Sequence, residues 1–231
     1  MHIFRSKRVQ NAGNPRGFWG KQTLRVMNRS HDALTDWGLG FVDINGEEKI
    51  LDIGCGGGKT VSKLAKTTAG TVWGIDRSAT AVRESLELNR KAVANNQVII
   101  CQGSVSAMPF EDETFDLITA VETYYFWPCP EKDFREISRV LKVGGKLMVL
   151  CEMRADAPNP RSYREILKTV DLRLPTADNL AMELKAAGFC DIIAHVRGNA
   201  LCVTAEKSHT PSLPRQFVLN RITKAKRQLR K

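Results

Sequence analysis

The sequence lacks the features of a membrane-spanning or secreted protein. No apolar run approaches the roughly 18–20 residues that are needed to cross a bilayer, so no membrane span is expected. The basic N-terminal stretch MHIFRSKRVQ is not followed by the apolar segment that a secretory signal carries. These absences favour a cytoplasmic protein.

Cysteine pairs at metal-binding spacing are also lacking. The six cysteines are widely scattered, with no CxxC pair and no Cys/His cluster. We interpret them as free thiols, mostly buried, in a reducing compartment. No metal site is expected.

The net charge of +10 is unevenly distributed along the 231 residues. Residues 1–31 and 208–231 each carry seven Lys/Arg and no Asp/Glu, whereas residues 32–207 carry 21 basic and 25 acidic residues. The globular body is therefore mildly acidic, unlike a basic nucleic-acid-binding face. We expect solvated basic ends, with contact to an anionic partner as the alternative.

Strand and helix patterns alternate through the middle of the chain. Residues 21–41 are predicted to form one or two helices, with Ser30 as N-cap of the second. The predicted strands that follow are KILDI, TVWGI, QVIIC, FDLITAV and KLMVLCE, and the predicted helices cover residues 59–68, 79–94 and 132–141, the last ending near Gly144-Gly145. Short strands rich in Val, Ile and Leu that alternate with helices predict a doubly wound α/β domain with a mostly parallel sheet.

The pattern changes after a proline-rich connection, RADAPNPRS. A helix is predicted over residues 176–187, followed by the strands CDIIAHV and ALCVTAEK, which Gly198-Asn199 would join as an antiparallel hairpin. The predicted organisation is therefore an N-terminal helical lid over residues 1–44, a core over residues 45–207 and a basic tail over residues 208–231.

The stretch LDIGCGGGKT concentrates glycines directly after a predicted strand. A nucleotide-binding P-loop needs its first glycine where the chain has Ile53, and a dinucleotide fingerprint needs its third glycine where the chain has Lys59. In addition, the carboxylate of Asp52 would repel a pyrophosphate at the helix N-terminus. Phosphate ligands are therefore disfavoured.

A ligand with an ammonium group and no phosphate suits this loop better. Asp52 precedes three alternate glycines, Gly54, Gly56 and Gly58, whose lack of side chains permits close approach of a ligand. Asp76 ends the next predicted strand, twenty residues beyond Gly56, where a carboxylate can accept both hydroxyls of a ribose. A nucleoside that carries an amino acid is S-adenosylmethionine.

Five stretches in register resemble the class I S-adenosylmethionine-dependent methyltransferases, in the ubiquinone/menaquinone-biosynthesis-type (methyltransferase domain 11-like) subgroup. They are LDIGCGGGKT, GIDRSATAV, CQGSVSAMPFEDETFDLITAV, RVLKVGGKLMVLCE and LKAAGFCDIIAHV, within roughly residues 45–206. The resemblance implies a Rossmann-like, seven-stranded, mostly parallel sheet with an antiparallel last strand and an N-terminal helical lid. It also implies methyl transfer from S-adenosyl-L-methionine, which leaves S-adenosyl-L-homocysteine.

The same resemblance implies the residues that contact the cofactor. One departs from the family pattern, because Ser104 stands where an aspartate is usual; its hydroxyl can still bond the adenine amino group, without a charge. The implied cofactor-binding residues are Asp52, Gly54, Cys55, Gly56, Asp76, Arg77, Gly103, Ser104, Val105 and Val121.

The acceptor pocket is expected beside VETYYFWPCP, after the fourth strand of the sheet. Its four successive aromatics either wall that pocket or pack the loop onto the sheet. Glu122 is a candidate general base, substrate anchor or cofactor contact, and His31 in the lid is a second catalytic candidate, with capping or surface exposure as its alternative. The catalytic candidates are Glu122, Tyr124 and His31, and the candidate substrate-binding residues are Trp19, Tyr124, Tyr125, Trp127, Arg154 and Tyr163.

The acceptor itself is predicted to be a small molecule. The Asn/Asp-Pro-Pro-aromatic motif of many amino-methylating nucleic-acid enzymes is missing, since the chain reads Glu-Thr-Tyr-Tyr after the fourth strand. An RNA or protein methyltransferase that uses the basic ends, and a non-catalytic protein that binds S-adenosylmethionine, are the alternatives. The sequence leaves open whether the protein is a monomer or a homodimer.

Overall fold

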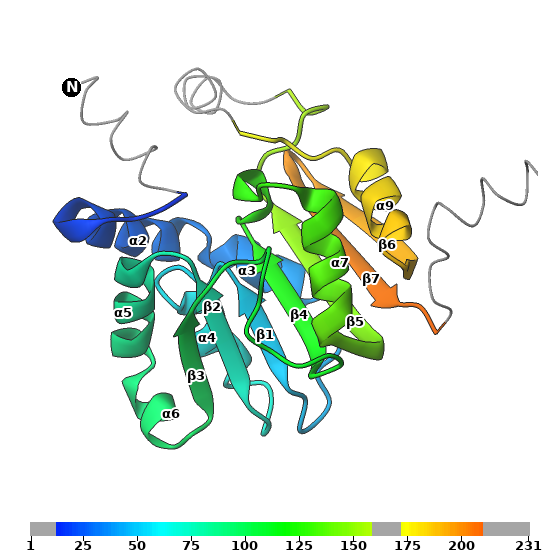
Figure 1. The fold of residues 1–231 in the computed structure, drawn as a ribbon. Coiled ribbons are helices and arrows are strands. Elements are labelled where there is room, and N and C mark those ends of the chain that lie inside the picture. Colours follow the sequence, from blue (N-terminus) through cyan, green and yellow to red (C-terminus); the bar gives the residue numbers. More distant parts are fainter. Residues whose placement is uncertain (1–12, 159–171, 210–231) are drawn as a thin grey trace, which may run out of the picture.

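The computed structural model describes residues 13–158 and 172–209, and a seven-stranded sheet forms its centre (Figure 1). The strand order is β3-β2-β1-β4-β5-β7-β6, in which β1 to β5 pair in parallel and β7 is antiparallel to both of its neighbours. The predicted fold class is therefore confirmed, including the hairpin at the C-terminal edge. The strands are β1 (Ile50–Ile53), β2 (Val72–Asp76), β3 (Val98–Gln102), β4 (Phe115–Val121), β5 (Leu141–Cys151), β6 (Phe189–Arg197) and β7 (Ala200–Lys207).

Helices cover both faces of the sheet, as Figure 1 shows. The bounds are α2 (Gly17–Ser30), α3 (Asp32–Leu39), α4 (Lys59–Leu64), α5 (Ala79–Leu88), α6 (Arg90–Ala94), α7 (Pro130–Val140) and α9 (Ala177–Ala186). Along β5, Leu147 packs into the core layer that contains α7 and α9, and Met148 packs into the layer that contains α3 and α4. This alternation explains why the central strands are apolar on both sides. Among the described residues, no helix is both long and apolar enough to cross a membrane.

Three local predictions were wrong. The helix predicted over residues 79–94 is interrupted at Asn89, whose side-chain amide donates to the carbonyls of Ser85 and Gly58. Ser30 ends α2 and donates to the carbonyl of Met27, so it is not the N-cap of α3. Gly144-Gly145 does not end a helix: α7 ends at Val140, and the glycine pair lies inside β5 at an irregularity in its pairing with β4.

The six cysteines are free thiols, as predicted, and Cys55, Cys151 and Cys202 are buried. Most of the two basic ends and all of residues 159–171 lie outside the described residues. The expected domain boundaries and the role of the basic tail therefore stay predictions.

Candidate active site

A cavity lies at the carboxyl ends of β1, β2 and β4, where the order of the parallel strands reverses. This edge is where open α/β sheets bind their ligands, because successive loops diverge there. Four parts of the chain line the cavity: the lid, the glycine loop, the ends of β2 and β3, and the segment after β4. Of the predicted cofactor-binding residues, the lining includes Gly54, Cys55, Gly56, Asp76, Arg77, Gly103, Ser104, Val105 and Val121.

The glycine loop has a backbone that requires glycine. Gly54, Gly56 and Gly58 have φ angles of +69°, +52° and +79°, in the left-handed region that other residues rarely adopt. A Cβ on Gly54 would also lie 2.4 Å from the hydroxyl oxygen of Thr123. The loop is fixed to the sheet, since the amides of Gly54 and Cys55 both donate to the carbonyl of Ile75. Its open, rigid backbone suits close contact with a ligand.

Asp76 places a carboxylate on the cavity wall at the end of β2. One of its oxygens accepts the amide of Gly56 at 3.0 Å, and the other accepts the amide of Ser78 at 2.8 Å. Burial raises the pKa of Asp76, and the two amide hydrogen bonds oppose that rise. Because each carboxylate oxygen can accept more than one hydrogen bond, Asp76 can still bind a pair of ligand hydroxyls.

Asp52 lies deeper than predicted. Its side chain is buried, it accepts the hydroxyl of Thr119 at 2.7 Å, and it is not among the residues that line the cavity. Burial raises the pKa of Asp52 to about 7, and the negative charge of Asp76 adds to the rise. Asp52 therefore joins β1 to β4 inside the sheet and is not part of the cavity wall.

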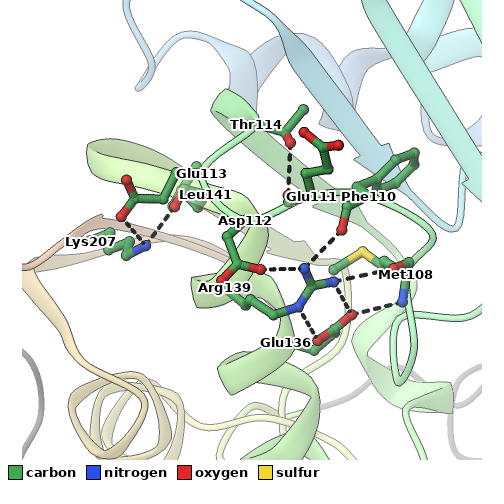
Figure 2. Close-up of polar contacts among 10 residues, drawn as sticks. All are labelled: Met108, Phe110, Glu111, Asp112, Glu113, Thr114, Glu136, Arg139, Leu141 and Lys207. Atoms are coloured by element: carbon green, nitrogen blue, oxygen red, sulfur yellow. Dashed lines mark hydrogen bonds and ion pairs between the residues drawn. The ribbon is translucent and has the colours of Figure 1, made fainter.

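The turn that contains Ser104 is anchored through the segment that follows it. Figure 2 shows the guanidinium of Arg139 on α7 donating to the carbonyls of Met108 and Phe110 and pairing with Asp112 and Glu136. Glu136 in turn accepts the amide of Met108 at 2.8 Å. These contacts join the β3–β4 connection to α7 and thereby hold its cavity-lining turn in place.

The N-terminal segment forms the roof of the cavity. The side-chain amide of Asn28 on α2 donates to the carbonyl of Gly57 at 3.2 Å. Arg77 donates to the carbonyl of Gly13 at 2.7 Å, and the hydroxyl of Ser78 donates to the carbonyl of Pro15. The lid is therefore attached directly to the loops that follow β1 and β2.

Two predicted catalytic residues line the cavity. Glu122, directly after β4, and His31, between α2 and α3, both line the cavity. One oxygen of Glu122 accepts the amide of Glu152 and lies 3.4 Å from the hydroxyl of Tyr125. Burial raises the pKa of Glu122 to about 8, helped by the negative charge of Glu152, and burial lowers the pKa of His31.

The aromatic run divides between wall and core. Phe126 and Trp127 line the cavity, and the indole of Trp127 donates to the hydroxyl of Thr123 at 3.2 Å. Tyr124 and Tyr125 are buried in the core and are not among the lining residues. The hydroxyl of Tyr124 donates to Glu183 on α9 at 2.9 Å. Trp127 belongs to both wall and core, since it is also buried in the core. That the aromatic wall belongs to an acceptor pocket stays a prediction.

Trp19 and Arg154, also predicted to bind the substrate, are not among the residues that line the cavity. Trp19 is half exposed on α2, and Arg154 forms an ion pair with Asp156 at 2.8 Å. Tyr163 lies outside the described residues.

Sequence reasoning missed Asn28 and Glu152. The first lies one helical turn before His31 and so shares its face of the lid. The second directly follows β5, at the same edge of the sheet as Glu122. The sequence positions of Asn28 and Glu152 could therefore have identified both residues as candidates.

Comparisons with known proteins agree with this geometry. Residues 51–149 match the model of a family described as a methyltransferase domain. The chain is 30% identical over 156 residues to cycloartenol-C-24-methyltransferase 1 of Oryza sativa subsp. japonica, covering 67% of this chain and 44% of the relative. It is 28% identical over 177 residues to 27-O-demethylrifamycin SV methyltransferase of Amycolatopsis mediterranei (strain S699), covering 74% and 64% respectively.

A solved structure shares the fold. Phosphoethanolamine N-methyltransferase 2 of Haemonchus contortus, in complex with S-adenosyl-L-methionine, superposes with a TM-score of 0.73 at 16% identity, over 84% of this chain and 59% of that one. The chain spans about half the length of the curated relatives it matches.

Proposed function

We propose that the protein is a class I S-adenosylmethionine-dependent methyltransferase that transfers a methyl group to a small molecule by in-line displacement, because residues 51–149 match the model of a methyltransferase domain. The observation that carries this proposal is Asp76, whose carboxylate lines the cavity twenty residues after Gly56 and is bonded to the amide of Gly56. A carboxylate held against a glycine loop is suited to the hydroxyls of a ribose.

The residues around Asp76 fit the rest of S-adenosylmethionine. Ser104 and Val105 offer a hydroxyl and an apolar side chain beside the adenine position, and the bare backbone of Gly54 and Gly56 leaves space for the amino-acid part. When bound, S-adenosylmethionine supplies a methyl group activated by its sulfonium.

The chain's own task is then to align the acceptor and exclude water. Trp127 and Phe126 provide apolar wall, and the lid closes the cavity over them. Glu122 and His31 face the same space and are our candidates for groups that orient the acceptor or receive its proton. Tyr124 would act through packing, because its hydroxyl is bonded to Glu183.

A small acceptor is supported by two observations. The N-terminal segment lines one side of the cavity through Leu24, Asn28 and His31, which favours an acceptor small enough to lie inside it. Two relatives carry names that refer to small molecules, a sterol and a rifamycin precursor.

Calorimetric titration with S-adenosylhomocysteine tests the cofactor assignment, with NADH as the control ligand. We expect micromolar binding of S-adenosylhomocysteine only, weakened at least roughly 30-fold in Asp76→Ala, because hydrogen bonds to a charged group contribute about 1.5–3 kcal/mol each. Asp43→Ala removes the same side chain at a position that is 82% exposed, and should bind like wild type. Absence of binding to wild type, or equal binding by Asp76→Ala, would refute the assignment.

Transfer of a labelled methyl group tests the acceptor class. We expect label to enter a panel of small aromatic and apolar acceptors and not bulk RNA or protein. Label in RNA that falls steeply with added salt would instead favour a role for the basic ends.

A further inference from the structure

Three side chains from distant parts of the chain meet at the acceptor end of the cavity. They are His31 between α2 and α3, Glu122 after β4 and Glu152 after β5. Each offers one donor atom, and the three atoms lie within 4.8 Å of one another. We propose that His31, Glu122 and Glu152 bind a divalent cation, which holds an oxygen atom of the methyl acceptor.

The spacing of the donors fits ligands of one ion better than direct hydrogen bonds. The Nε2 atom of His31 lies 3.7 Å from an oxygen of Glu152, which is too long for a hydrogen bond. Ions with bonds of about 2.0–2.2 Å to nitrogen and oxygen hold adjacent ligands roughly 3–3.5 Å apart. A small movement of the side chains would therefore complete the site.

The charges of the cluster favour a bound cation. Two carboxylates lie side by side, and the imidazole of His31 faces one of them, that of Glu152. Two adjacent carboxylates repel each other when both are ionised, and a bound cation relieves that repulsion. The imidazole of His31 offers a ring nitrogen as a metal ligand, and its Nε2 atom faces Glu152.

The surrounding structure orients the ligands. The amide of Glu152 and the hydroxyl of Tyr125 are both near one oxygen of Glu122, and that hydroxyl also accepts the amide of Met153 at 2.8 Å. Such outer contacts fix the direction of metal ligands in known sites. Glu122 itself has a φ of +58°, so its backbone turns the side chain out of the strand direction.

The position of the cluster indicates what the cation would do. Because His31 and Glu122 line the cavity, the coordination positions that the three protein ligands leave open would face the acceptor. One imidazole with two carboxylates suits Mn²⁺ or Zn²⁺. The acceptor class is then a molecule with a hydroxyl, enol or carboxylate oxygen near the methylated atom, which rests on the proposed methyl transfer.

The test uses the metal alone, so its result does not depend on methyl transfer. The full chain is treated with EDTA, dialysed and titrated with MnCl₂ and ZnCl₂, with free Mn²⁺ followed by EPR. We expect one tightly bound ion per chain, with affinity at least tenfold lower in His31→Gln and Glu152→Gln. Glu87→Gln, on an exposed side chain of α5, should bind like wild type.

A second measurement needs no variant. Pulsed EPR of Mn²⁺ bound to wild type should show coupling to an imidazole nitrogen. Lack of that coupling, lack of stoichiometric binding, or equal affinity in the two triad variants would overturn the proposal. Because S-adenosylhomocysteine binding is measured separately, failure of the metal site and failure of the cofactor assignment are distinguishable.

Discussion

Replacing Asp52 by asparagine should change how the stability of the protein depends on pH. The carboxyl group is buried, and its pKa of about 7 exceeds the value of about 3.9 expected in the unfolded chain. An acid whose pKa is higher in the folded chain ionises more easily in the unfolded chain, so ionisation at higher pH stabilises the unfolded state relative to the folded state. The contribution of Asp52 to the free energy of unfolding therefore falls as pH rises from about 4 to about 7.

The magnitude follows from the two pKa values. Between about pH 5.5 and pH 8, linkage predicts that wild type loses about 2 kcal/mol relative to Asp52→Asn. For a chain of this size, that corresponds to roughly 4–8 °C in melting temperature. The buried asparagine amide adds a cost that is the same at both pH values, and other titrating groups are common to both proteins. The difference between the two pH slopes thus isolates Asp52.

Thermal and urea unfolding of the ligand-free proteins at the two pH values measure this difference. Asp43→Asn, at an exposed position, should keep the wild-type slope. Equal slopes for wild type and Asp52→Asn would show that Asp52 titrates as an ordinary carboxyl group, and the argument from burial would be wrong.

Three further substitutions test the site and its supports. Gly54→Ala should lose about 1–3 kcal/mol of stability and bind S-adenosylhomocysteine more weakly, because the backbone of Gly54 is left-handed and a Cβ there meets the side chain of Thr123. Gly46→Ala is the control, since no atom lies within 4 Å of its Cβ position, and it should keep both the stability and the affinity of wild type. Tyr124→Phe should lower the free energy of unfolding in urea by about 1 kcal/mol, because it removes the hydrogen bond to Glu183, and should leave methyl transfer unchanged. Slower methyl transfer at unchanged stability would instead place Tyr124 against the acceptor. Arg139→Gln should lower S-adenosylhomocysteine affinity several-fold in calorimetry by releasing the β3–β4 connection, and unchanged affinity would contradict the anchoring role.

Much of the fold could be predicted from the sequence because the sheet is buried on both faces. Strands such as FDLITAV are nearly continuous apolar runs, and the chain alternates them with amphipathic helices. The break at Asn89 was not predictable, since it depends on a partner far away in sequence. Asn89 leaves the helix because the carbonyl of Gly58, 31 residues earlier, accepts its side chain.

Site residues were predictable from the sequence where a motif fixes their position at a strand end. They were not predictable where the direction of the side chain determines whether a residue reaches the cavity. The position of Asp76 at a strand end sufficed to place it on the cavity wall. The four aromatics after β4 looked equivalent in sequence, yet the short helical turn over Tyr124–Phe126 sends Tyr124 and Tyr125 inward and leaves Phe126 and Trp127 at the cavity. The meeting of His31, Glu122 and Glu152 depends on tertiary structure alone, because no spacing in sequence relates them.

The attachment of the lid to the ligand loops has a kinetic consequence. The bonds from Asn28 to Gly57, from Arg77 to Gly13 and from Ser78 to Pro15 connect the roof to the same loops that would hold a ligand. Movement of the N-terminal segment therefore disturbs these loops, so local unfolding of that segment and release of a ligand from the cavity are expected to be coupled.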